Sequence, residues 1–96
     1  MIISLDFDNT FTADREFWLE FIELARKYQH TVVCVTSRLD KLSNREELNF
    51  SLPSYVEKFF CGDIPKEAYM RALNRKVDIW IDDTPEAIPE NIFRIS

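Results

Sequence analysis

The sequence predicts a three-layer α/β/α fold, in which a parallel sheet of five strands lies between two layers of helices. Short apolar runs alternate with amphipathic runs along the chain, and the connections between them are short. This alternation is typical of parallel sheets, whose strands are joined by right-handed crossover helices. With 96 residues, of which 46% are hydrophobic, we expect residues 1–96 to form a single domain with one small core.

The first half of the chain predicts two strands, each followed by a helix. Residues 1–5 form an apolar run that indicates a strand, and apolar residues spaced by three and four predict an amphipathic helix over about 14–29. The β-branched run 31–35 lacks polar alternation, which favours a strand covered on both faces. Ser43 and Glu46 have the spacing of a capping box, which predicts that a short helix begins there.

The second half predicts three further strands, within 55–61, at 77–81 and at 92–95. Pro65 at a first helical position starts a helix after the first of these strands. The apolar face of that helix is expected to carry Ala68, Tyr69, Ala72 and Leu73. Thr84 followed by Pro85 predicts the N-cap and first turn of a brief helix. Gly62, the only glycine, is expected where the backbone needs unusual freedom.

Composition narrows the class of protein. The net charge of −5 disfavours general nucleic-acid binding, because phosphate neutralisation supplies most of that affinity; we expect a nucleic acid only as an end that serves as a substrate. No apolar run approaches the ~20 residues of a membrane span, and the N-terminus lacks the features of a signal peptide. Cys34 and Cys61 lack metal or redox spacing and are expected to be buried, reduced thiols, so the expected location is cytoplasmic.

Polar residues follow the first four predicted strands, at the sheet edge where parallel α/β folds bind ligands. Asp6 and Asp8 would point to the same side of the first strand, where like charges repel and raise one another's pKa. Such a pair needs a cation or two separate chemical roles. The later stations are Thr36 with Ser37 and Arg38, then Lys66, then Asp82 with Asp83. Lys66 opposes the dipole of its own helix, which favours a specific anionic partner.

These residue types suit phosphoryl transfer. Several carboxylates at one edge cannot all stay ionised unless a hard, oxygen-seeking cation such as Mg²⁺ relieves their repulsion. One carboxylate can attack phosphorus to give an acyl phosphate, and a second can protonate the leaving group and then activate water. A hydroxyl group and a lysine can hold the transferring oxygens.

The same stretches resemble the haloacid dehalogenase (HAD) superfamily. Asp6-Phe7-Asp8-Asn9-Thr10 is similar to its DxDxT signature, and the run 33–38 is similar to its second motif, an apolar strand that ends in Thr or Ser. Lys66 stands where the third-motif lysine would be, and the run 80–83 resembles the acidic fourth motif. The resemblance implies a Rossmann-like HAD core. The segments after the first motif and between the second and third motifs leave no room for a cap domain.

The resemblance also implies roles for the site residues. Asp6 would be the nucleophile, Asp8 the general acid/base, and Thr36 and Lys66 would bind the phosphoryl group. The expected metal ligands are Asp6, Asp8 through its backbone carbonyl, Asp82 and Asp83, with Asp83 the stronger candidate for direct contact. The expected substrate-binding residues are Asn9, Thr10, Ser37 and Arg38. For Arg38 two interpretations stay open, a surface residue or a ligand of substrate phosphate.

We therefore expect a Mg²⁺-dependent phosphomonoester hydrolase that acts through an aspartyl phosphate. The alternative is a phosphate-binding or regulatory module with the same fold and little turnover. A receiver module also uses an acidic pocket with Thr and Lys, but its phosphoacceptor position does not fit a DxDxT in the first strand. The phosphorylated substrate is of open class. A capless site suits a large substrate, or a small one enclosed by a neighbouring subunit of an oligomer.

Overall fold

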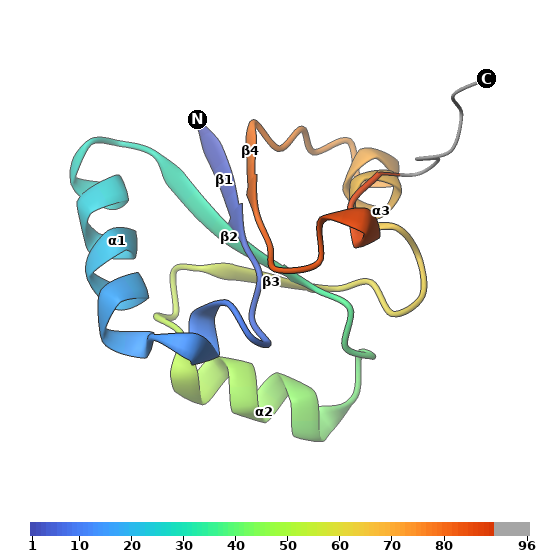
Figure 1. The fold of residues 1–96 in the computed structure, drawn as a ribbon, viewed down its shortest axis with the longest axis horizontal. Helices are drawn as coiled ribbons and strands as arrows, with labels where there is room; N and C mark the ends of the chain where they lie inside the picture. The colour runs from blue at the N-terminus through green and yellow to red at the C-terminus, as the bar shows by residue number, and fades with distance from the viewer. Residues whose placement is uncertain (90–96) are drawn as a thin grey trace.

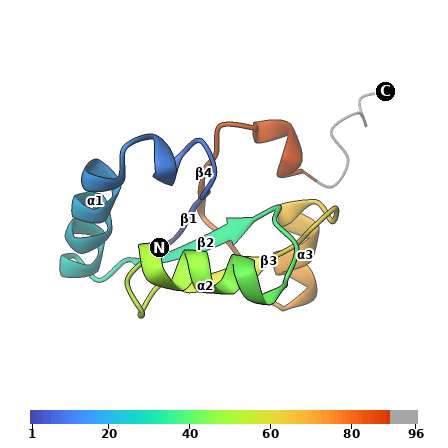
Figure 2. The ribbon, with the colours of Figure 1, turned by 90° about the horizontal axis from the view of Figure 1, so that it is seen from below.

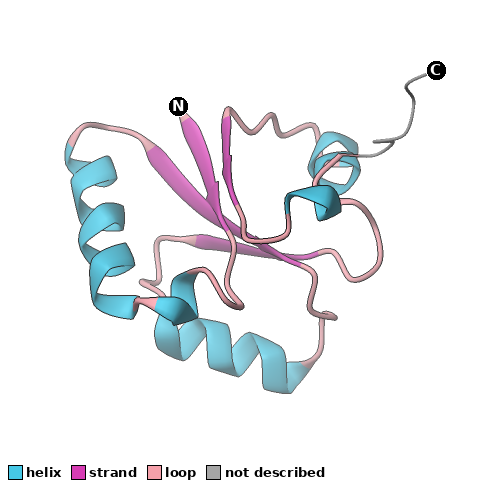
Figure 3. Ribbon diagram, viewed as in Figure 1, coloured by secondary structure: helices cyan, strands magenta, loops and turns pink. Residues whose placement is uncertain are grey.

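A computed structural model describes residues 1–89 of the chain (Figure 1). Strands and helices alternate along it, as Figure 3 shows, so the expected α/β class is confirmed. The elements are β1 (Ile2–Leu5), η1 (Phe11–Ala13), α1 (Arg15–Lys27), β2 (Thr31–Thr36), α2 (Leu42–Ser51), β3 (Glu57–Phe60), α3 (Lys66–Ala72), β4 (Ile79–Ile81) and η2 (Pro85–Ala87).

The sheet is parallel, with the strand order β3-β2-β1-β4. β1 lies in the middle, where Ser4 stands opposite Val33 of β2 and opposite Trp80 of β4. Within residues 1–89 the sheet has four strands and not the five that were expected. The fifth expected strand, 92–95, lies outside the described residues.

Apolar side chains pack on both faces of the sheet, because successive residues of a strand point to opposite sides. Ile3 and Leu5 of β1 join one cluster, to which α1 and α2 contribute Ile22 and Leu48. A second cluster contains Val33, Val35, Cys61 and Met70, the last of these from α3. Figures 1 and 2 both place α1 and α3 at opposite ends of the molecule. The unpatterned apolar run of β2 is thus explained by cover on both faces, as expected.

The first two helices differ in how well their starts were predicted. Asp14 caps α1, and its Oδ1 accepts a hydrogen bond from the Phe17 amide at 3.3 Å. The capping box expected at Ser43 is wrong, since α2 begins at Leu42 and its N-cap residue makes no side-chain bond. Asn44 instead donates to the backbone carbonyl of Leu39, at 2.9 Å. This contact fastens the helix to the loop before it.

The apolar face expected for the third helix is confirmed only in part: Tyr69 packs against the second cluster, but the fully buried residues are others. α3 begins at Lys66, one residue later than predicted, and its buried residues are Lys66 and Met70, one helical turn apart. Ala72 and Leu73, which were expected on the apolar face, are exposed. The inward row starts with a lysine, so a search for apolar periodicity selects the wrong row of this seven-residue helix.

Two turns at the carboxyl ends of strands need unusual backbone angles. Gly62 follows β3 with φ 58°, and a Cβ atom there would lie 3.2 Å from the side chain of Leu39. Asn9 follows β1 with φ 63°, and its amide donates to Thr12 Oγ1 at 2.9 Å. Glycine and asparagine are the residues that most readily adopt such angles. The expectation for Gly62 is confirmed.

Both cysteines are buried free thiols. Burial raises the pKa of Cys34 to about 12, and burial also raises the pKa of Cys61. These thiols therefore behave as core residues. No helix within residues 1–89 has the length and apolar character that crossing a membrane requires.

Candidate functional site

The polar residues that follow the strands lie together at the carboxyl edge of the sheet, as predicted. The strand order reverses at β1, because β2 and β3 lie on one side of it and β4 on the other. Parallel sheets bind ligands at such a reversal. A pocket of about 260 Å³ lies here, lined by Asp6, Asp8, Asn9, Thr36, Ser37, Lys66, Asp82, Asp83, Thr84 and Ala87. Thr10 and Arg38 lie directly behind this lining and contact its carboxylates.

Lys66 is the buried cation of the site. Its side chain is 2% exposed, its Nζ lies 2.9 Å from Asp6 Oδ1, and it also donates to Asp82 Oδ2. A buried charge is tolerated only when it is paired. Burial alone would lower the pKa of Lys66, but the hydrogen bonds to the two carboxylates outweigh burial and raise that pKa. Lys66 therefore has the specific anionic partners that its position predicted.

Asp6 is held from three directions. Its backbone amide donates to the Ile81 carbonyl at 2.9 Å, which joins the carboxyl ends of β1 and β4. Lys66 donates to its Oδ1, and the Thr10 hydroxyl lies 3.3 Å from its Oδ2. Burial raises the pKa of Asp6 to about 6, although Lys66 acts in the opposite direction. The carboxylate is thus fixed in place and still mostly ionised at neutral pH.

Three carboxylates of the pocket gather closely enough to share a cation. Asp6, Asp82 and Asp83 each offer an oxygen, and these oxygens lie within 4.8 Å of one another. When ionised they carry −3 against +1 on Lys66, so the group as described has a net charge of −2. An all-oxygen set with an excess charge of −2 fits Mg²⁺, which prefers carboxylate ligands. The expected contribution of the Asp8 backbone carbonyl stays a prediction.

Asp8 faces a different partner. Arg38 donates to both of its oxygens, from Nε to Oδ2 at 2.9 Å and from Nη2 to Oδ1 at 2.8 Å. These hydrogen bonds hold the pKa of Asp8 below its ordinary value. The Arg38 guanidinium also lies over the Phe7 ring, 5.1 Å from its centre. Arg38 is therefore a partly buried residue, 22% exposed in its side chain, that forms a bidentate pair with Asp8 in this arrangement. Its binding of substrate phosphate stays a prediction.

Two residues of α2 complete this arrangement and were missed by sequence reasoning. Nη1 of Arg38 donates to Asn44 Oδ1 at 3.2 Å and to Glu47 Oε1 at 2.6 Å. The only sequence signal is that Asn44 and Glu47 are three residues apart, on one face of a helix. α2 thus anchors the arginine that holds Asp8.

Two threonines line the pocket, one at the end of β2 and one in the loop after β4. Thr36, the last residue of β2, is buried, and its Oγ1 accepts a hydrogen bond from the Arg38 amide at 3.2 Å. Thr84, also missed as a lining residue, donates its backbone amide to Asp82 Oδ1 at 2.9 Å. Thr84 does stand at the N-cap of η2, but it makes no side-chain capping bond there. The loop after β4 is therefore shaped by Asp82.

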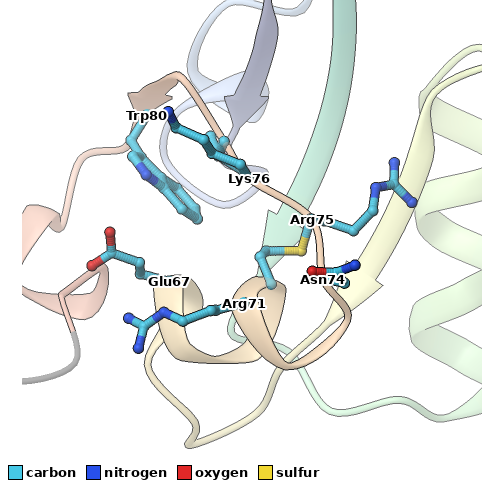
Figure 4. Close-up of a pocket in the computed structure, with 8 residues that line it drawn as sticks. Glu67, Arg71, Asn74, Arg75, Lys76 and Trp80 are labelled. Atoms are coloured by element: carbon cyan, nitrogen blue, oxygen red, sulfur yellow. The ribbon is translucent and has the colours of Figure 1, made fainter.

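A second hollow, of about 230 Å³, lies between α3 and β4 and contains none of the predicted residues. Figure 4 shows Trp80 on one side of it and Glu67 with Arg71 on the other. Its Arg75 is already paired, with Nη2 2.6 Å from Glu57 Oε1. The carboxylate pocket is the stronger candidate, because it combines a buried lysine with several carboxylates at the strand reversal.

Comparison of the chain with protein-family models, curated proteins and solved structures found no match. The fold and the site together still define a class of protein. It is a parallel α/β protein with an acidic pocket at the carboxyl edge of its sheet, in which a buried lysine joins the ends of two strands.

Proposed function

We propose that the protein is a Mg²⁺-dependent phosphomonoester hydrolase that acts through an aspartyl phosphate on Asp6. We further propose that its fold is the three-layer, Rossmann-like core of the HAD superfamily without a cap domain. One observation carries this proposal. Lys66 is buried between Asp6 and Asp82 at the strand reversal, and Asp83 lies close enough to share a cation with both carboxylates.

Asp6 is the nucleophile in this proposal. One carboxylate oxygen attacks phosphorus, the bond between phosphorus and the ester oxygen breaks, and the departing oxygen takes a proton from Asp8. Asp8 then removes a proton from a water molecule, which attacks the phosphoryl group, releases inorganic phosphate and restores Asp6. The hydrogen bonds from Lys66 and Thr10 support this role, because they fix the direction of the attacking carboxylate.

The other lining residues bind the phosphoryl group. Asp6, Asp82 and Asp83 are the residues that would hold Mg²⁺, which when bound offsets negative charge on that group. The Thr36 hydroxyl and Lys66 line the same pocket and would donate to the transferring oxygens. Asn9 and Ser37 remain proposed substrate-binding residues on the β1 and β2 sides of the pocket. Thr10, which lies behind the lining, would act on the substrate through its contact with Asp6.

Asp8 can donate a proton only after its pairing with Arg38 is broken. While both of its oxygens accept from Arg38, the carboxylate is ionised and carries no proton to give. We infer that the substrate phosphate takes the place of Asp8 on the guanidinium, which suits bidentate phosphate binding. Asp8 is then free to take up a proton, and Arg38 becomes a substrate ligand.

The direct test is phosphate release from p-nitrophenyl phosphate with Mg²⁺. We expect Asp6→Asn to lower kcat by about 10³-fold or more, because the nucleophile is lost. The matched control is Asp63→Asn, since Asp63 is exposed and does not line the pocket. EDTA should abolish turnover and added Mg²⁺ should restore it. Undiminished turnover in Asp6→Asn would remove Asp6 as the nucleophile.

A second candidate function is a phosphate-binding or regulatory module with little turnover. The pairing of Asp8 with Arg38 favours it, because a carboxylate held ionised is a poor general acid. The two candidates differ in turnover over a panel of nucleotides, sugar phosphates, phosphopeptides and 3′-phosphorylated nucleic-acid ends. Binding of phosphate without release from any of these substrates would favour the module. Buried free thiols suit a reducing compartment, and we place either activity in the cytoplasm.

A further inference from the structure

One side of α1, continued by its C-cap residue, carries an apolar stripe that is largely exposed within the described part of the chain. The α1 stripe consists of Phe17, Phe21, Leu24 and Tyr28. Phe17 and Leu24 are each 56% exposed and Tyr28 is 63% exposed. Figures 1 and 2 both place α1 at an end of the molecule, with no other described element on its outer side. Side chains spaced by four, three and four residues form the seam along which two helices pack.

The aromatic part of the stripe is held in place before any partner binds. Phe17 and Phe21 both pack edge-on against Trp18, with ring centres 4.8 Å and 5.4 Å from the indole. Trp18 and Phe21 also pack against the core cluster beneath α1, so Phe21 is the partly buried member of the stripe. Ordered side chains lose little conformational entropy when they dock, which favours association.

Charged residues beside the stripe identify the partner. Glu20 and Lys27 lie on the same flank, two helical turns apart, and both line a shallow groove of about 810 Å³ along this face. If a second copy of α1 packs antiparallel, this flank of one helix lies beside the same flank of the other. Glu20 of each copy then faces Lys27 of the other copy. In a parallel pair the same flank would face Trp18 and Ala25, which carry no charge.

We propose that the α1 stripe is the interface through which two copies of this chain associate, antiparallel and about a two-fold axis. This inference is independent of the proposed function. An aromatic side chain offers about 150–250 Å², of which more than half is exposed at Phe17 and Tyr28 and less at Phe21. With the exposed part of Leu24 added, the stripe would bury about 400 Å² per copy. That is about half of a standard interface, so we expect a reversible dimer with a Kd of about 10–100 µM.

The test is sedimentation equilibrium on the full chain, from ~1 µM to ~500 µM. The mass should rise from 11.4 kDa toward twice that value with concentration. Leu24→Glu should keep the chain monomeric over the whole range, whereas Phe50→Glu, at an exposed site on α2, should leave the dimer unchanged. Circular dichroism would show that both variants are folded.

Charge exchange then tests the antiparallel arrangement. Glu20→Lys and Lys27→Glu should each weaken the dimer about 5-fold or more at low salt, and the double variant should restore it, because each pair regains opposite charges. A chain that is monomeric at ~500 µM, or a dimer that Leu24→Glu leaves intact, would overturn the proposal. A double variant no tighter than the single variants would overturn the antiparallel arrangement.

Discussion

Asp6 and Asp8 stand two residues apart on one loop, but their carboxylates lie in opposite environments. Asp6 is buried and is paired with the buried Lys66, and its pKa is raised to about 6. Asp8 is 46% exposed and is paired with Arg38, and its pKa is lowered. Burial dominates at the first residue, and hydrogen bonding dominates at the second.

This difference shows how one short motif can hold two carboxylates without a like-charge contact. The sequence predicts that the pair repel and raise one another's pKa. For Asp8 that prediction is wrong, and the pKa of Asp6 is raised by burial and not by Asp8. Each carboxylate has its own cation, because Lys66 and Arg38 approach from α3 and from the loop after β2. Two separate environments are what two separate chemical roles require.

Removing the buried cation Lys66 should lower the stability of the fold the most. Lys66→Met leaves the buried carboxylates of Asp6 and Asp82 without a cation, so we expect it to lower the free energy of unfolding by about 3–5 kcal/mol. Urea unfolding measures this, with Lys76→Met at an exposed site as the control. A loss no larger than that of the control would show that Lys66 does not hold the two carboxylates together.

The next effect is a pH-dependent loss of stability at Asp6. The folded pKa of about 6 lies above the ordinary value of 3.8, so folding favours the protonated acid. Protonated Asp6 therefore contributes roughly 3 kcal/mol to the free energy of unfolding below about pH 4. This contribution is lost as the pH rises through about 6. Urea unfolding without Mg²⁺ between pH 4 and 7 should show this step, and Asp6→Asn should not. Identical pH profiles for the two proteins would contradict the assignment.

Removing the cation of Asp8, the more exposed of the two carboxylates, should reduce stability less. Arg38→Gln removes the bidentate pair, but water can solvate Asp8, so the free energy of unfolding should fall by only about 1 kcal/mol. The pKa of Asp8, followed by NMR titration, should rise toward its ordinary value. Arg45→Gln, which removes an exposed pair with Asp40, is the control. An unchanged Asp8 pKa would show that Arg38 does not pair with it in solution.

The last prediction concerns the reactivity of Cys34, a buried thiol. Its pKa of about 12 leaves a thiolate fraction about 10³-fold below that of an ordinary thiol at pH 8. Iodoacetamide should therefore leave Cys34 unmodified in the folded protein and label it in urea, as mass spectrometry can show. Rapid labelling of the folded protein would mean that β2 is not covered as described.

The parts of the fold that depend on local pattern could be predicted from the sequence. The apolar runs placed the described strands, and each strand's carboxyl end then located Asp6, Thr36, Lys66 and Asp82 at one edge. Parallel topology alone brings such positions together, whatever the details of packing. For this reason the site could be located without knowledge of any contact.

The rest depends on contacts between distant residues, which local pattern does not contain. Arg38 meets Asp8 across 30 residues, and its anchors Asn44 and Glu47 lie on a helix with a weak apolar face. The buried row of α3 includes Lys66, which only its carboxylate partners make tolerable. Sequence periodicity cannot reveal a charge that is buried because of a residue elsewhere in the chain.

In the proposed reaction, Asp6 is the residue to which phosphorus becomes attached. The most direct measurement is a crystal structure of the protein with Mg²⁺ and fluoroberyllate, which mimics an acyl phosphate. We predict a beryllium–oxygen bond to the Asp6 carboxylate, with Lys66 and Thr36 against the fluorides. An adduct on any other residue, or none at all in a protein that hydrolyses p-nitrophenyl phosphate, would contradict it.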